Sequence, residues 1–80
     1  ITSLKIYPNP ASTQISVHSS IPFTVGQKAE VLDTYGKILM EVSCEAGEKH
    51  LNIATDKLKS GIYFLRLNKT PSVVSKFVIK

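Results

Sequence analysis

Apolar residues in this chain recur at every second position in short bursts, which is the spacing of strands whose side chains alternate between two faces. Ile15 and Val17, for example, alternate with Ser16 and His18. Gly, Pro, Asn, Asp and Ser separate the bursts, and no stretch has the periodicity of an amphipathic helix. The pattern predicts an all-β sandwich. We expect seven strands: Leu4 to Tyr7, Gln14 to Ser19, Ala29 to Asp33, Lys37 to Cys44, Lys49 to Ala54, Ile62 to Asn68 and Val74 to Lys80.

Three of these strands indicate which side chains should form the core. The fourth strand directs one apolar set inward: Ile38, Met40, Val42 and Cys44. The last two strands direct a second set inward: Tyr63, Leu65, Leu67, Phe77 and Ile79. Residues between them, such as Arg66 and Lys76, are left for the opposite face. We therefore expect the last residues of the chain to form a structural strand.

The length and charge of the chain exclude several classes of function. With 80 residues it forms a single domain over 1–80, which we interpret as a piece of a larger protein because it begins without Met or a leader. A domain this small buries only about 60% of its unfolded surface, which leaves little material for a catalytic cavity. The net charge is +4, but Arg66 is the only arginine and the lysines are scattered, so no nucleic acid partner is expected.

Two turns have an interpretable chemistry. In Asp33-Thr34-Tyr35-Gly36-Lys37, Asp at the first position and Gly at the fourth favour a type I turn that Asp33 caps, with Gly36 at positive φ in a bulge. Gly61 stands two residues before Tyr63 at the start of a strand. This spacing favours a tyrosine corner, in which the phenol bonds a backbone group upstream. We therefore assign all four residues to the fold.

No group of residues predicts catalysis or a bound metal. His18, His50 and Cys44 can be combined on paper with Asp33 or Asp56, but no sequence signature places a Cys-His pair together. The two histidines are far apart in the sequence, so no metal or other cofactor is expected. Cys44 is the only cysteine, which excludes an internal disulfide, and we expect it to be a small buried hydrophobe.

Four segments occur in order along the chain: Leu4 to Ser12, Val31 to Lys37, Leu58 to Leu67 and Lys76 to Lys80. Together they resemble the type A C-terminal sorting domain of the type IX (Por) secretion system, found at the ends of proteins exported by Bacteroidetes. The first segment looks like the opening box of that family, and the second is similar to its Asp-x-x-Gly-Lys or Arg hairpin. Each segment alone is common in β proteins, whereas their combination is specific.

The resemblance implies a seven-stranded, immunoglobulin-like, antiparallel β-sandwich that acts as a noncatalytic export address. The implied cargo is the N-terminal part of the same polypeptide, which passes through the periplasm and outer membrane to the cell surface or the medium. The implied partners are outer-membrane and shuttle components of the secretion system and a sortase-like peptidase. This peptidase usually removes the domain, so that the cargo is joined to anionic lipopolysaccharide or released.

With the resemblance as the basis, the candidate recognition residues are Pro8, Asn9, Pro10, Lys37, Lys76, Phe77, Val78, Ile79 and Lys80. The prolines can instead serve only to end an edge strand, and the terminal segment can serve only to complete the sandwich. As an edge strand, the terminal segment could be recognised by a partner strand that pairs with it. An exposed edge also predicts weak self-association between copies of the domain. In the last hairpin the family frequently has a glycine, and we expect Asn68 to supply the left-handed residue instead.

The alternative function is an adhesive or carbohydrate-binding sandwich appended to a surface enzyme. Such a module predicts a row of exposed aromatic residues over a concave face, and the chain has no Trp and only three Tyr. A fragment of an enzyme whose active site lies in another part of the protein is compatible with the sorting role.

Overall fold

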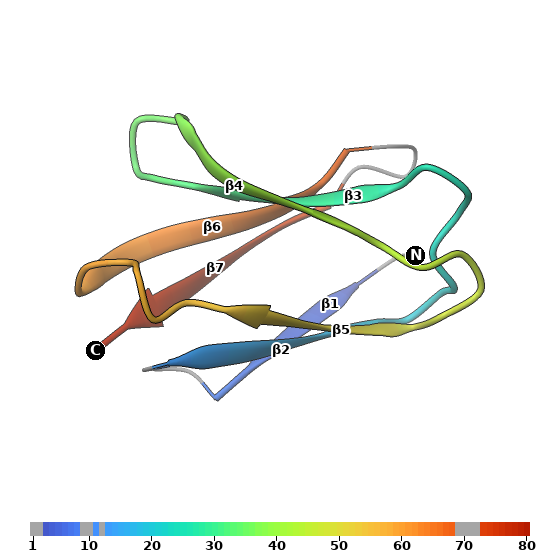
Figure 1. Ribbon diagram of the computed structural model, residues 1–80, viewed down its shortest axis with the longest axis horizontal. Helices are drawn as coiled ribbons and strands as arrows, with labels where there is room; N and C mark the ends of the chain where they lie inside the picture. Colours follow the sequence, from blue (N-terminus) through green and yellow to red (C-terminus); the bar gives the residue numbers. More distant parts are fainter. Residues whose placement is uncertain (1–2, 9–10, 12, 69–72) are drawn as a thin grey trace.

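The computed structural model describes residues 3–8, 11, 13–68 and 73–80, so Asn9 and Pro10 of the nominated set lie outside the described residues. The strands are β1 Leu4–Tyr7, β2 Gln14–Ser19, β3 Lys28–Leu32, β4 Ile38–Ser43, β5 His50–Ala54, β6 Gly61–Leu67 and β7 Val74–Ile79. They form two antiparallel sheets, ordered β1-β2-β5 and β4-β3-β6-β7. Figure 1 shows the sheets as two stacked layers. The predicted seven-stranded, all-β sandwich is confirmed. The described residues contain no helix able to cross a membrane.

All seven predicted strands are present, and the first two have the predicted bounds. The other five differ by one residue at one or both ends. At Asp33, Lys37 and Lys80 the terminal backbone groups bond outside the ladder. The Asp33 N–H donates to the Lys37 carbonyl across the turn at 3.0 Å, and the Lys80 N–H donates to the Ala11 carbonyl at 2.8 Å. Asp33 therefore belongs to a turn, and Lys80 pairs with Ala11, which lies between β1 and β2 of the other sheet. Periodicity alone does not distinguish such positions from a strand.

One expected core residue faces outward because β4 contains a bulge. Val31 pairs with Met40 but Leu32 pairs with Ile38, so Leu39 is the extra residue. Met40 packs against the core as expected, whereas Ile38 is 44% exposed and lies outside the core cluster. The prediction that Ile38 faces inward is wrong, since a one-residue insertion reverses the alternation at that end of the strand.

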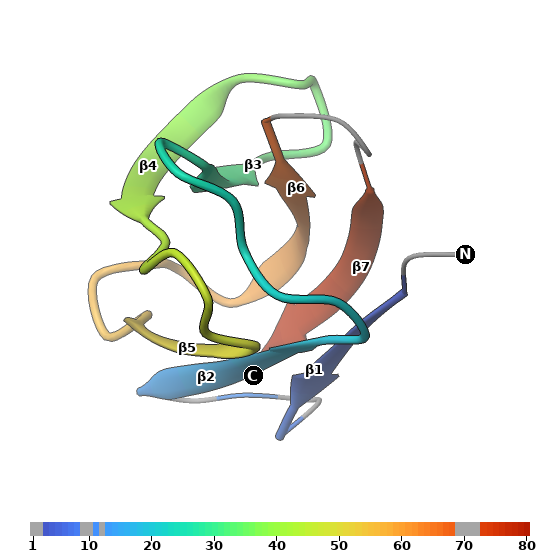
Figure 2. The same cartoon turned by 90° about the vertical axis from the view of Figure 1, so that its right-hand side faces the viewer.

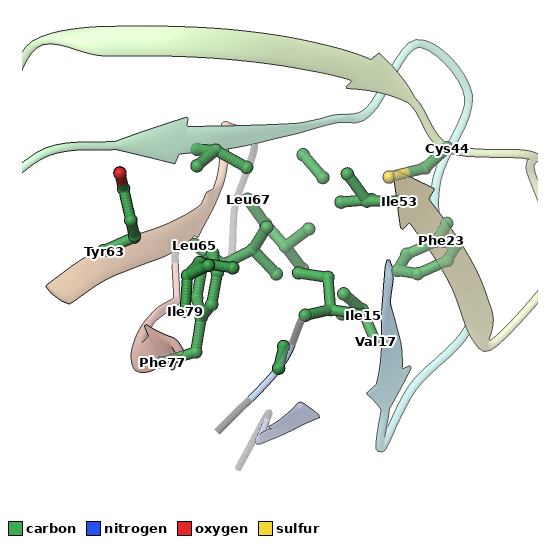
Figure 3. Packing of buried hydrophobic residues seen from close by; sticks show 13 residues of the cluster. Ile15, Val17, Phe23, Cys44, Ile53, Tyr63, Leu65, Leu67, Phe77 and Ile79 are labelled. Carbon is green, nitrogen blue, oxygen red and sulfur yellow. The ribbon is translucent and has the colours of Figure 1, made fainter. Parts of the chain in front are cut away.

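The core fills the space between the two sheets. Its largest fully buried side chains include Ile15 and Ile53 from one sheet and Leu65, Leu67 and Phe77 from the other. Figure 3 shows these side chains directed into the interlayer space. The Phe77 ring stacks on the Tyr63 ring with centroids 5.9 Å apart. Each such side chain contributes roughly 1.5–3 kcal/mol through its removal from water.

Two further predictions concern fold-fixing residues. The Tyr63 hydroxyl donates to the Lys59 carbonyl at 2.6 Å, which is the backbone bond upstream that the tyrosine corner predicts. Cys44 is 8% exposed within the core cluster, as expected of a buried hydrophobe. Because burial disfavours the thiolate, the pKa of the Cys44 thiol is raised.

Asn68 does not adopt the left-handed conformation that was expected of it, because no described residue other than glycine has positive φ. Its side-chain oxygen instead accepts the Lys28 N–H at 2.8 Å, and its own N–H donates to the Lys28 carbonyl at 3.1 Å. The expectation is therefore wrong at this position. Asn68 ties the end of β6 to the start of β3 and so extends the pairing of those strands.

The seam between the sheets is closed on one side by the last strand. Figure 2 shows β7 of the four-stranded sheet beside β1 of the other sheet, and these two strands are in contact. Ala11 adds a parallel bridge, since its N–H donates to the Val78 carbonyl at 2.8 Å and its carbonyl accepts the Lys80 N–H. The outer edge of β7 is thus occupied by another segment of the chain at Val78 and Lys80.

Candidate functional site

The turn between β3 and β4 is built around one carboxylate. Asp33 Oδ1 accepts the backbone N–H groups of Tyr35 and Lys37, both at 2.9 Å. The Gly36 N–H donates to the Asp33 carbonyl at 3.1 Å, and Gly36 has φ of 85°, where a side chain would be strained. This is the turn geometry that the sequence predicts. It holds Tyr35 at the tip of the turn, 95% exposed.

Beside this turn, apolar residues gather on part of the outer face of the four-stranded sheet. The register places Ile38, Leu32, Phe64 and Lys76 in one row across β4, β3, β6 and β7. Ile62 and Val78 form a neighbouring pair on the same face, and Val74 lies opposite Arg66. We call this surface the apolar face and define it by six residues: Leu32, Ile38, Ile62, Phe64, Val74 and Val78. Ile38, Ile62 and Val74 are each at least 44% exposed.

A hollow of about 190 Å³ lies where the apolar face meets the turn. Leu32, Phe64 and Val74 supply its apolar lining, and the Asp33 turn and Arg66 border it. Leu32 is only 5% exposed although it is not part of the core cluster between the sheets. Neighbouring side chains on the outer face therefore bury Leu32, so the floor of the hollow is well packed.

The charges around the hollow are partly neutralised. Arg66 Nε donates to Glu30 Oε1 at 2.8 Å, across β6 and β3. Glu30 is buried, and this ion pair compensates the charge of its carboxylate. Lys76 lies directly opposite Phe64, and Lys37 is exposed at the end of the turn. Glu41 is exposed opposite Glu30 on the same face, and Asp33 borders the hollow, so the margin carries charges of both signs. An apolar centre with such a margin suits a partner that presents apolar side chains.

The structure places the described members of the nominated recognition set in several different locations. Lys37, Lys76 and Val78 lie at or on the apolar face. Phe77 and Ile79 are 0% and 3% exposed and point into the core, so no partner can contact their side chains in the folded domain. A third location holds Pro8, which is exposed and follows β1 in the other sheet. Lys80 is exposed beyond the end of β7.

The sequence interpretation missed the residues at the centre of the apolar face. The alternation argument assigned neither Ile62 and Phe64 nor Leu32 to a face. The available signal was the unbroken run from Ile62 to Leu65, in which residues of both faces are apolar. Such a run indicates a strand with an apolar surface on each side.

The outer face of the three-stranded sheet is different in character. Exposed polar residues cover it: Lys5, Tyr7, Gln14, His18, His50 and Asn52. The view that His18 and His50 are far apart is wrong in space, because β2 pairs with β5 and places them directly opposite each other. Their ring centroids are 6.0 Å apart. Strands distant in sequence become neighbours in a sandwich, and the sequence separation of two residues does not show this.

The structure does not bring together the cysteine and the histidines that the sequence analysis considered as a catalytic pair. Cys44 lies in the core between the sheets, whereas His18 and His50 are exposed on an outer face, so the Cys-His combination considered from the sequence does not form. Among the described residues, no group of three or more His, Cys, Asp and Glu side chains is placed to hold a metal ion.

Comparison with known families decides the identity of the domain. The family model described as the secretion system C-terminal sorting domain matches residues 5–80. The chain belongs to this family. A search of curated proteins gives no match. The resemblance inferred from the four segments is thereby confirmed over nearly the whole chain.

As a sorting domain of this family, the chain is a type IX secretion sorting signal. This role implies interaction with the type IX machinery, attachment to an N-terminal cargo, and export across the outer membrane to the cell surface or the extracellular space. Sorting domains of this family are in general non-catalytic.

Proposed function

We propose that this domain directs its cargo through the outer membrane and that the apolar face is the surface which the secretion machinery reads. The observation that carries the sorting role is the family match over residues 5–80. The apolar face supports the location, because it is an exposed apolar surface built around a packed hollow. Three of the candidate recognition residues also lie at or on this face: Lys37, Lys76 and Val78. The partner is an outer-membrane or shuttle component of the system.

Side-chain recognition on this face is favoured over strand addition at the end of β7. Ala11 already occupies the backbone groups that β7 offers through the Val78 carbonyl and the Lys80 N–H. A partner strand would have to displace Ala11, which is 1% exposed, before it could pair there. Docking on the apolar face requires no such rearrangement. The outward side chains of β7, at Val74, Lys76 and Val78, remain available to a partner docked there.

The later steps of the proposal concern the fate of the cargo. A sortase-like peptidase removes the domain, here taken as the single unit 1–80 at the carboxyl end of a larger exported protein. The cargo is then attached to the cell surface or released. This part of the proposal follows from the family and not from a feature of the folded domain.

A reporter assay tests the sorting role. A periplasm-directed fluorescent protein carrying residues 1–80 at its carboxyl end is expressed in a Bacteroidetes host, with and without a working type IX system. We expect the reporter outside the cell only when the system works. Retention of the folded fusion in the periplasm would contradict the sorting role and move the adhesive alternative to first place.

A pair of variants in the same assay tests the location. The double variant Ile62→Lys with Val74→Lys places two charges on the apolar face and should reduce delivery roughly tenfold or more, since charges in an apolar contact are poorly tolerated. The matched double variant Gln14→Lys with Asn52→Lys places the same charges on the polar outer face and should leave delivery unchanged. Equal delivery by the two folded double variants would show that the machinery reads another surface.

A further inference from the structure

The polar outer face contains a pair of histidines held by two paired strands. His18 of β2 and His50 of β5 are direct partners in the antiparallel ladder, so their side chains leave the same face of the sheet. Both side chains are exposed. Their rings lie 6.0 Å apart, centroid to centroid, with planes inclined at 39°. The backbone ladder fixes the separation of the two residues.

A third side chain orients the first histidine. The Tyr7 ring stacks on the His18 ring with an interplanar angle of 25°, and its hydroxyl lies 3.3 Å from His18 Nδ1. A histidine that is hydrogen-bonded at one ring nitrogen presents the other nitrogen to a ligand, which is the usual arrangement of metal-binding histidines. Tyr7 therefore acts as a positioning residue for His18 Nε2.

We propose that His18 and His50 form a two-nitrogen binding site for a divalent transition metal ion such as Zn²⁺ or Cu²⁺. Imidazole is a preferred ligand of both ions, with metal–nitrogen distances of about 2.0–2.1 Å for zinc. Two imidazoles on one ion have ring centroids roughly 5–6 Å apart at those distances, and the observed 6.0 Å reaches this range with a small ring rotation. Water completes the coordination, because the site is open to solvent.

The surroundings set the strength of the site. His18 also lines a hollow of about 330 Å³ with Ser3, Lys5, Ser19 and Ser20, which leaves room for coordinated water. Lys5 is the direct partner of His18 on the β1 side, so its ammonium group opposes a bound cation. With two protein ligands and a nearby positive charge, we expect weak and reversible binding rather than a structural metal. The inference does not depend on the proposed sorting function.

Titration of the untagged 80-residue chain with ZnCl₂, followed by calorimetry, tests the site. We expect one ion per chain. His18→Gln and His50→Gln should each lower the affinity at least about tenfold, since one nitrogen ligand remains. Lys5→Gln should raise it about threefold by removing a repulsive charge. Gln14→Ala, on the same face of β2, and Cys44→Ala should leave it unchanged.

A second measurement counts the ligands directly. Electron paramagnetic resonance of the Cu²⁺-loaded chain should show coupling to two imidazole nitrogens, and each histidine variant should show one. Circular dichroism of the metal-free variants establishes that they are folded. Zinc affinity that changes less than twofold in both folded histidine variants, or a copper spectrum without two nitrogens, would overturn the proposal and indicate adventitious binding elsewhere.

Discussion

The two outer faces of this sandwich are made by similar alternating strands and yet carry opposite chemistry. The face of β1-β2-β5 is polar, with residues such as Lys5, His18 and Asn52 exposed. The face of β4-β3-β6-β7 carries the apolar face around a packed hollow, with charged residues beside it. Polar residues on an outer face interact favourably with water, whereas exposed apolar area remains unfavourable until a partner covers it. The difference supports the proposal that the apolar face serves recognition.

The largest expected effect tests the distinction between the inner and outer sides of one strand. Phe77→Ala empties a fully buried position and should cost about 3–5 kcal/mol, which is much of the stability of a domain this size. Val78→Ala, one residue later on the apolar face, should cost about 1 kcal/mol or less. Urea unfolding followed by circular dichroism measures both. Equal losses would show that Val78 belongs to the core and would remove the basis of the comparison.

The next effect compares the two outer faces directly. Leu32→Ala removes the buried centre of the apolar face and should cost about 2 kcal/mol, because its neighbours pack around it. Ser16→Ala on the polar face removes only the exposed hydrogen bond to Asn52 Oδ1 and should cost at most about 0.5 kcal/mol. The same unfolding measurement applies. A neutral Leu32→Ala would mean that the apolar face is not packed.

A smaller effect tests the turn that borders the apolar face. Asp33→Ala removes the acceptor of two backbone N–H groups and should cost about 1 kcal/mol. Asp33→Asn keeps a side-chain oxygen at the same place and should retain most of that stability. Thermal unfolding distinguishes the two variants. If both lose the same amount, the carboxylate charge rather than the turn hydrogen bonds is what matters.

The smallest effect concerns the thiol that lies between the two faces. Burial raises the pKa of Cys44, so the folded state binds this proton more tightly than the unfolded state does. The resulting stability is complete below the ordinary pKa of a thiol and is lost as the pH rises through the raised pKa. Wild type should therefore lose slightly more stability than Cys44→Ala as the pH rises above the ordinary pKa of a thiol. Parallel pH profiles of the two proteins would contradict the burial of the thiol.

The sequence was sufficient for the parts of the fold that depend on local spacing. Alternation located all seven strands, and the positions of Asp33 and Gly36 determined a turn. Alternation could not reveal the bulge at Leu39, because pairing with β3 decides where the extra residue is accommodated. Hence Ile38 was placed on the wrong face.

The candidate sites were less accessible from the sequence because they depend on pairing between distant strands. The row through Leu32 and Phe64 exists only once β3 pairs with β6, and the histidine pair only once β2 pairs with β5. Neither pairing joins consecutive strands. The sequence shows which residue types are present, but only the strand pairing shows that they lie close together in the apolar face and in the histidine pair.

The bridge between Ala11 and β7 has a consequence for the order of events during synthesis. Ala11 and Ile79 lie near opposite ends of the described chain, so their contact closes almost the largest loop that the domain contains. Ribosomes deliver β7 last, and until it arrives the Tyr63 ring lacks its Phe77 neighbour and β6 lacks one partner strand. A nascent chain therefore cannot assemble the apolar face early. The apolar face is therefore complete only after translation has reached β7, the last strand of the domain.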